Sequence, residues 1–414
     1  MPGDTQESHA LAEGIARTSY GKLLAILSVR LRDVSAAEEA LSAAFEQALK
    51  SWPGNGIPGN PEGWLVQVAR NRGVDRLRRQ TVRDRIEPAL ALLAEEAAET
   101  NPDELFTDDR LKLLFVCAHP AIDPAMHTPL MLQSVLGLDA ARIGSAFLVS
   151  PSAMGQRLVR AKTKIRQAGI SFEIPEREHL NERVEAVLAA IYAAYGTGWD
   201  GDHGADTGTA GLADEALFLG DLLCSLLPSA PEALGLMALM LYTTSRRDAR
   251  RSTQGAYIPL DRQDTGRWNR SMISRAERLL IEAAAFDKPE RYQLEAAIQS
   301  AHVKGRLAGR PNWPAIEMLY ARLLELAPSL GAFVSHASAL AQMGRHEDAL
   351  ARLEAVAGEA GTYQPYWAVR AYCLRQAGRN AEAGKAYDMA IGLSEDASVK
   401  AFLGGEKASL GHAG

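Results

Sequence analysis

Cysteine, aromatic side chains and long apolar runs are all scarce in this chain of 414 residues. Its three cysteines, Cys117, Cys224 and Cys373, lie far apart and form no Cys-x-x-Cys pair, which argues against a disulfide framework and a zinc site. Aromatic residues make up 6% of the chain while Ala and Leu dominate, a composition that favours packed helices over sheets. We therefore predict an all-α fold.

Apolar runs stay well below the roughly 18–20 residues that a membrane-spanning helix needs. The segment Met1–Ala10 is polar and lacks the apolar core of a signal peptide. We expect a cytoplasmic protein with no membrane partner.

Patterns that carry catalysis are also missing. The sequence has no Ser/His/Asp order, no Gly-rich phosphate loop and no spaced set of metal ligands. We expect no catalytic residue, no metal and no cofactor, so an enzyme is the weakest of the functional classes considered.

Positive charge is concentrated in two segments of an acidic chain whose net charge is −6. Trp64–Ile86 holds seven Arg and two Asp, and Pro151–Arg166 holds three Arg, two Lys and no acid. Either segment alone would be consistent with a solvated helix face. The pair indicates two separate anion-binding surfaces.

Helical periodicity, loops and charge together divide the chain into four parts. Residues 8–86 form a first helical region, interrupted by a loop rich in Pro and Gly at Ser51–Pro61. Residues 87–104 form an acidic linker, within a stretch from Glu87 to Asp109 that has eight acids and no base. Residues 105–172 form a second helical region, and 176–414 a long C-terminal one.

The first basic segment begins Gly63-Trp64-Leu65 and continues Ala69-Arg70-Asn71, with Asp75, Arg78 and Arg79 further along the same predicted helix. Arginine side chains suit phosphate contacts, which are strong and independent of sequence. An asparagine such as Asn71 can hydrogen-bond the edge of a base.

The second basic segment predicts two helices joined by a short turn. Asp139 is a candidate N-cap of the first helix, and Ser150 caps the second with Pro151 at its first position. This is a helix-turn-helix pattern, whose second helix would enter the major groove of DNA.

An internal repeat lies near the end of the chain. The segment around Gly344-Arg345 matches the segment around Gly378-Arg379, 34 residues later, which is the period of TPR repeats. Ala337 and Ala349, and their counterparts Ala371 and Ala383, fall where paired helices touch closely. A generic antiparallel helix array remains the alternative.

The first basic segment closely resembles the −10 recognition helix of extracytoplasmic-function sigma factors, and the second resembles the −35 module of the same family. The resemblance implies binding to core RNA polymerase and promoter DNA. The residues that it assigns to the −10 element are Trp52, Trp64, Arg70, Asn71, Asp75, Arg78 and Arg79. Those assigned to the −35 element are Ser152, Gln156, Arg157, Arg160, Lys162 and Lys164. Those assigned to the polymerase are Glu38, Glu39, Ser42 and Phe45.

Residues 176–414 are similar to the TPR-like extension of one sigma subgroup, in which a regulatory role is expected. Pro259–Asn269 matches that subgroup's Leu-x-x-Gln-Asp-x-x-x-Trp core, and it supplies the regulatory candidates Asp261, Gln263, Asp264 and Trp268. The extension could also bind a separate protein partner. The alternative for the motif itself is a loop that packs Trp268 into the helical array.

Two positions depart from the family pattern. Glu39-Ala40-Leu41-Ser42-Ala43 stands where an Asp-x-x-Gln-Glu run is usual, and Arg142 stands where a Glu is usual. The loss of the usual Gln and Glu, at Ser42 and Ala43, motivates a second hypothesis, a degenerate sigma-like protein that acts as a non-initiating regulator or scaffold.

Overall fold

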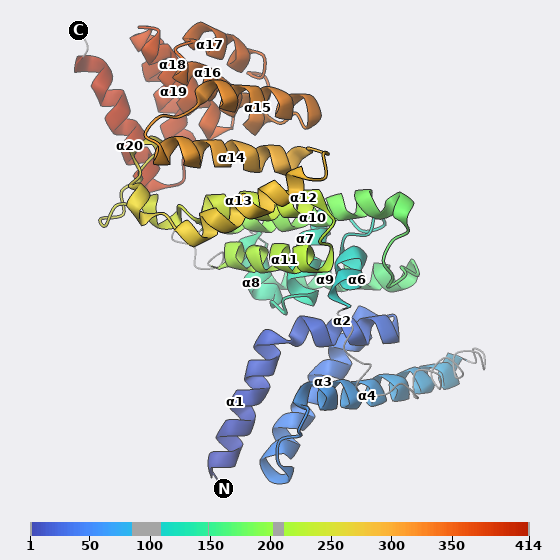
Figure 1. The fold of residues 1–414 in the computed structure, drawn as a ribbon. Coiled ribbons are helices and arrows are strands. Elements are labelled where there is room, and N and C mark those ends of the chain that lie inside the picture. Colours follow the sequence, from blue (N-terminus) through green and yellow to red (C-terminus); the bar gives the residue numbers. More distant parts are fainter. Residues whose placement is uncertain (1, 85–108, 148, 202–210, 413–414) are drawn as a thin grey trace. The chain divides into compact units, whose positions relative to one another are not determined.

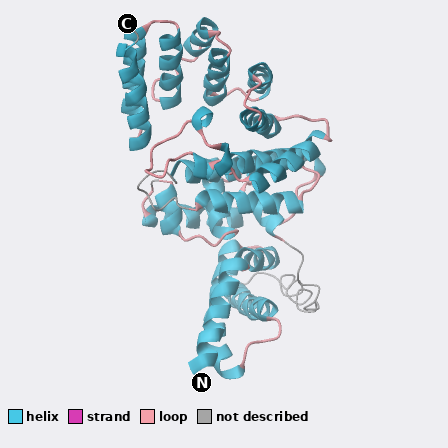
Figure 2. Ribbon diagram, turned by 60° about the vertical axis from the view of Figure 1, so that its left-hand side comes forward, coloured by secondary structure: helices cyan, strands magenta, loops and turns pink. Residues whose placement is uncertain are grey.

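The computed structural model describes residues 2–84, 109–147, 149–201 and 211–412. These residues divide into two compact units, the first ending at residue 216 and the second beginning at 217. The all-α prediction is confirmed, since the described residues form helices and loops but no strand (Figures 1 and 2). In the same residues, no helix is long and apolar enough to cross a bilayer. The acidic linker predicted at 87–104 lies outside the described residues.

Four helices begin the first unit: α1 (Pro2–Thr18), α2 (Tyr20–Leu31), α3 (Val34–Asn55) and α4 (Pro61–Asp84). Asp33 caps α3, because its carboxylate accepts the backbone N–H groups of Ser35 and Ala36 at 2.9 and 3.1 Å. Leu and Ala side chains from α2, α3 and α4 pack into one core around Leu41. Gly73 lets α4 cross closely over α2, because a Cβ there would lie 2.8 Å from Leu31.

The loop predicted at Ser51–Pro61 is shorter than expected, because α3 continues through Pro53 to Asn55. Proline removes one N–H, but Pro53 sits in the last turn, where little of the helix remains to be disrupted. Gly56 then ends the helix at φ 84° and donates its N–H to Trp52 O at 3.0 Å. Burial of Trp52 holds this final turn against the core.

The first unit continues with α6 (Arg110–Cys117), α7 (His127–Ser134), α8 (Ala140–Ala146), α9 (Pro151–Gln167) and α10 (Arg177–Gly201). We expected the C-terminal region to begin at 176, but α10 packs on α6, α7 and α8. Thr128 donates to Ala190 O at 2.9 Å, and Arg183 donates to Phe115 O. These contacts place α10 in the first unit rather than the second.

The second unit contains the end of α11 (Leu212–Leu226), then α12 (Pro231–Thr244), α13 (Arg270–Ala284) and α14 (Arg291–Leu307). The α14 N-terminus is capped from another helix. Glu232 of α12 accepts the backbone N–H of Tyr292 at 2.8 Å and the side-chain amide of Gln293 at 3.1 Å. Gly235 permits this approach, because a Cβ there would lie 2.7 Å from Gln293 N.

The rest of this unit is a series of helices that pack on their neighbours (Figure 1). They are α15 (Trp313–Leu326), α16 (Leu330–Gln342), α17 (His346–Glu354), α18 (Gln364–Gln376), α19 (Asn380–Leu393) and α20 (Ala397–Ala408). The sequence repeat is also a geometric one, because α16 and α18 start 34 residues apart and end before Gly344 at φ 78° and Gly378 at φ 75°. Ala337, Ala349, Ala371 and Ala383 are fully buried, as the close helix contacts predicted for them require.

Candidate nucleic-acid interface

Helix α4 presents the exposed side of the first basic segment. Asn60 caps it, accepting Gly63 N at 2.9 Å. Leu65, Val66 and Ala69 face the core. Asn71, the predicted base contact, is exposed, and so is Gln67 one turn before it. The side-chain amide of Gln67 donates a hydrogen bond to the side-chain oxygen of Asn71 at 3.5 Å.

Trp52 and Trp64, both predicted at the −10 surface, contact each other inside the first unit. Their ring centroids are 5.5 Å apart with an interplanar angle of 62°. Trp52 is only 2% exposed, and its indole N–H has no hydrogen-bond partner among the described residues. Trp64 is half-buried. Trp52 is therefore part of the core in this structure, and the exposed residues of the turn are Gly54–Ile57, Gly59 and Asn60.

Arg70 is also placed inward, at 9% exposure, near Arg30 of α2. Burial first, and the charge of Arg70 second, lower the pKa of Arg30. Asp75, Arg78 and Arg79 lie on the second half of α4, but their side chains fall outside the described part. Among the predicted −10 residues whose side chains the structure describes, Asn71 is the fully exposed one.

The second basic segment folds as α8, a short turn and α9. The predicted caps are confirmed: Asp139 accepts Arg142 N at 2.8 Å, and Ser150 accepts Ala153 N at 3.4 Å with Pro151 in the first turn. Gly144 allows the turn to close, because a Cβ there would lie 2.6 Å from Val149 O.

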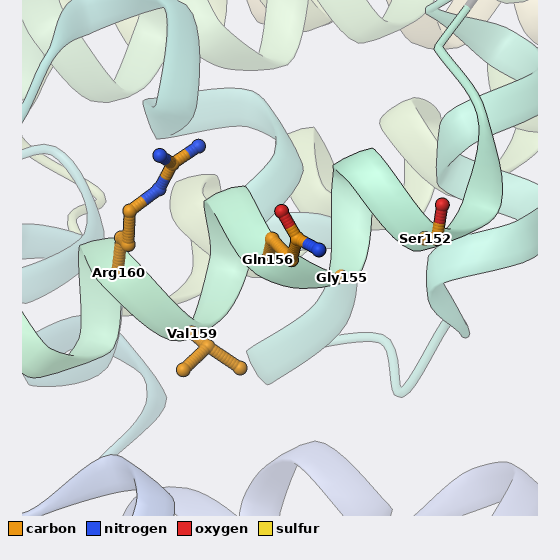
Figure 3. A pocket seen from close by; sticks show the side chains of 5 residues that line it. All are labelled: Ser152, Gly155, Gln156, Val159 and Arg160. Carbon is orange, nitrogen blue, oxygen red and sulfur yellow. The ribbon is translucent and has the colours of Figure 1, made fainter.

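Helix α9 has one buried and one exposed side. Met154, Leu158, Ala161 and Ile165 are buried against the first unit. The side chains of Ser152, Gln156 and Arg160 follow one another at intervals of four residues on the exposed side, beside Gly155 and Val159 in a shallow hollow (Figure 3). Arg157 and Lys164 are exposed as well.

Lys162 is the exception among the predicted −35 residues. It is 6% exposed, and its ammonium donates to both carboxylate oxygens of Glu38 at 2.5 Å. A second ion pair joins α9 to the start of α3, between Arg166 and the N-cap residue Asp33 at 3.3 Å. The sequence assigned Lys162 to DNA and Glu38 to the polymerase, and nothing in it signalled that the two side chains meet.

The remaining predicted polymerase contacts also lie on α3. Glu39 and Ser42 are exposed, and Phe45 is half-buried against the core of the first four helices. Glu38, Ser42 and Phe45 share one side of the helix, since they are four and three residues apart. Glu38, the first of these three residues, is the one that pairs with Lys162.

The regulatory candidates lie in and beside two short 3-10 turns of the second unit, Leu260–Arg262 and Thr265–Arg267. Gln263 and Trp268 are buried, at 6% and 3% exposure, and Asp261 and Asp264 are exposed. Asp264 caps the second turn by accepting Gly266 N at 2.8 Å. The burial of Trp268 agrees with the alternative given for this motif, a loop that packs Trp268 into the helical array.

Contacts from this part of the chain to α20 were not foreseen. Arg251 donates to Asp396, and Arg262 pairs with Glu406 at 2.9 Å. Burial raises the pKa of Asp396, but hydrogen bonds from Arg251, Ser398 and the backbone together lower it to about 2. Arg251 and Asp396 are 145 residues apart in the chain, so a pattern of neighbouring residues could not have predicted that they pair.

The cysteines are free, with Cys117 and Cys373 buried. Burial raises the pKa of Cys117 to about 12 and that of Cys373 to about 11, so both remain thiols near neutral pH. Within the described ranges, no three His, Cys, Asp or Glu side chains converge as metal ligands would.

Comparison with known proteins adds four findings. The model of sigma-70 region 2 matches residues 15–83, which include α2 and α3 and nearly all of α4. The model of a family of unknown function, DUF6596, matches residues 183–284. The uncharacterized protein R00370 of Rhizobium meliloti (strain 1021) is 38% identical over 378 residues, which cover 90% of this chain and 89% of that protein. No solved structure matches the chain.

Proposed function

We propose that this chain, which contains a sigma-70 region 2 at residues 15–83, is a sigma-70 family initiation factor of the extracytoplasmic-function type. The chain belongs to one family with the uncharacterized protein R00370 of Rhizobium meliloti. In this proposal it binds core RNA polymerase and directs it to promoters through −10 and −35 contacts. The region 2 match over residues 15–83 carries the proposal. No catalytic residue and no cofactor take part.

Exposed polar groups on α4 support the −10 role. Asn71 offers both a donor and an acceptor to a base edge, and its neighbour Arg72 is exposed beside it. The contact between the buried Trp52 and the half-buried Trp64 fixes the turn between α3 and α4 from within. In the proposal, Trp52 supports the loop that receives an unstacked base, rather than touching that base.

The α8–α9 pair supports the −35 role. As a DNA-binding helix-turn-helix it would place the exposed side of α9, with Ser152, Gln156 and Arg160, in the major groove. Helix α9 contains no acidic residue, so its whole exposed side is compatible with phosphate.

For the second unit we propose a TPR-like domain that regulates the sigma activity. The repeated geometry of α16–α17 and α18–α19 supports the TPR-like assignment. Regulation in cis would replace a separate inhibitor protein, and a partner protein bound to the helical array is the other possibility.

Binding to core RNA polymerase tests the proposal. The full chain is expected to co-purify with core polymerase, and Ser42→Arg should abolish this by placing a long charged side chain on the exposed face of α3. The same change at Ser152, which is exposed on α9, is the matched control and should leave polymerase binding intact. A chain that fails to bind core polymerase would instead be the non-initiating regulator or scaffold.

A further inference from the structure

The second unit contains a cavity of about 340 Å³ that the sigma function does not use. Its lining residues come from the Leu260–Arg262 turn, from helices α14, α15 and α16, and from Pro311 between α14 and α15. Its volume falls within the range of small-molecule sites. The side chains that decide its chemistry are Asp261, His302, Arg306, Trp313 and Tyr320.

Arg306 supplies a cationic group with unused hydrogen-bonding capacity. One terminal nitrogen donates to the Gln263 backbone carbonyl at 3.2 Å. The Nε atom is buried, and it has no hydrogen-bond partner among the described residues. Leaving a charged donor buried and unpaired is costly, and a carboxylate is the acceptor that matches a guanidinium edge.

The walls beside Arg306 are aromatic and uncharged. His302 and Trp313 meet edge to face, with ring centroids 5.6 Å apart and an interplanar angle of 74°. Burial, and then the charge of Arg246, lower the pKa of His302 to about 4, so its ring is neutral near pH 7. Tyr320 adds a further ring. These surfaces suit an apolar or aromatic group.

Asp261 is the acidic residue of the lining, and it is exposed. A purely anionic ligand would be repelled by it, whereas a ligand with an ammonium group would be attracted. We infer that the cavity binds a small zwitterion of the amino-acid type. Its carboxylate pairs with Arg306, its apolar side chain packs on Trp313 and His302, and its ammonium group faces Asp261.

Calorimetric titration of the full chain tests the inference, with the common L-amino acids as probes. Saturable binding is expected for at least one amino acid with a large apolar side chain, L-phenylalanine or L-tryptophan foremost. Phenethylamine lacks the carboxylate and 3-phenylpropionate lacks the ammonium group. Each should bind about tenfold or more weakly, the loss expected for one charge-assisted hydrogen bond.

Two variants locate the site. Arg306→Gln removes the cation, and Ser338→Leu fills the cavity while leaving Arg306 in place. Both should abolish binding. Arg310→Gln is the control, because Arg310 is exposed and outside the lining, and it should bind as the unmodified chain does. No heat with any amino acid, binding that survives both cavity variants, or 3-phenylpropionate binding as tightly as L-phenylalanine would each overturn the inference.

Discussion

Lys162 of α9 forms an ion pair with Glu38 of α3, which lies 124 residues away in the chain. Both carboxylate oxygens of Glu38 are 2.5 Å from the Lys162 ammonium nitrogen. Lys162 is 6% exposed and Glu38 is 22% exposed, so the pair is largely removed from water. The contact joins the helix proposed for −35 recognition to the helix proposed to bind the polymerase. While it is formed, Lys162 is not available to DNA.

A double-mutant cycle measures this contact. Glu38→Gln and Lys162→Met should each destabilise the chain, with a coupling energy of about 1–3 kcal/mol in urea unfolding. This is less than the roughly 3–5 kcal/mol lost on breaking a fully buried pair, because Glu38 keeps some exposure. Lys164→Met, at an exposed position on the same helix, is the control and should change the unfolding free energy little. Strict additivity of the two changes would mean that the pair does not form in solution.

Helix α9 should contribute a measurable electrostatic component to promoter binding. Arg157→Ala and Arg160→Ala should each lower the slope of log affinity against log salt concentration by about one unit, because each removes a phosphate contact. Arg310→Ala, exposed in the second unit, should leave the slope unchanged. The salt series is best recorded on complexes of the full chain with core polymerase. Unchanged slopes for both α9 variants would exclude this helix as a DNA surface.

Asn71 should act on strand opening rather than on duplex binding. Asn71→Ala is expected to cost about 1–3 kcal/mol in open-complex formation, as the loss of a good base contact does. Permanganate reactivity of unpaired thymines measures opening, and binding to −35 duplex DNA provides the comparison. Gln167→Ala, an exposed amide at the end of α9, is the matched control. Equal losses in opening and in −35 binding would contradict the assignment.

Asp396 should contribute to stability at acidic pH. Its pKa falls from 3.8, the ordinary value for an aspartate side chain, to about 2 in the folded chain. The unfolded chain therefore binds more protons between these values, and the stabilisation present above about pH 4 is lost as the pH falls toward 2. Asp396→Asn should lower the unfolding free energy at neutral pH and flatten its decline over that window. Asp388→Asn, at the more exposed pair with Lys407, is the control and should lower the unfolding free energy at neutral pH less than Asp396→Asn does. A decline as steep in Asp396→Asn as in the unmodified chain would contradict the role of this carboxylate.

Local sequence signals predicted local structure well. Ser150 and Pro151 marked the start of α9, because a helix cap depends on a few adjacent residues. The 34-residue spacing of Gly344 and Gly378 recurs as the spacing of α16 and α18. The same reasoning misjudged Trp52. A dense run of Pro and Gly predicted a loop there, but burial of the indole extends α3 past Pro53.

Relationships across the chain could not be predicted in this way. Lys162 has the charge and position of a DNA contact, and only the fold brings Glu38 to it. Helix α10 is a second case. It begins at Arg177, just after the boundary expected at 176, but Arg183 donates to Phe115 O of α6 and Thr128 of α7 donates to Ala190 O of α10. Such pairings depend on three-dimensional packing that propensity and periodicity do not encode.

Run-off transcription with core RNA polymerase on fragmented genomic DNA is the direct test of promoter-directed initiation by this chain. We expect discrete transcripts that depend on the full chain, start downstream of shared −10 and −35 sequences, and are strongly reduced by Asn71→Ala but not by Gln167→Ala. A chain that binds core polymerase yet yields no specific start site, or yields the same start sites in equal amounts with Asn71→Ala, would contradict it.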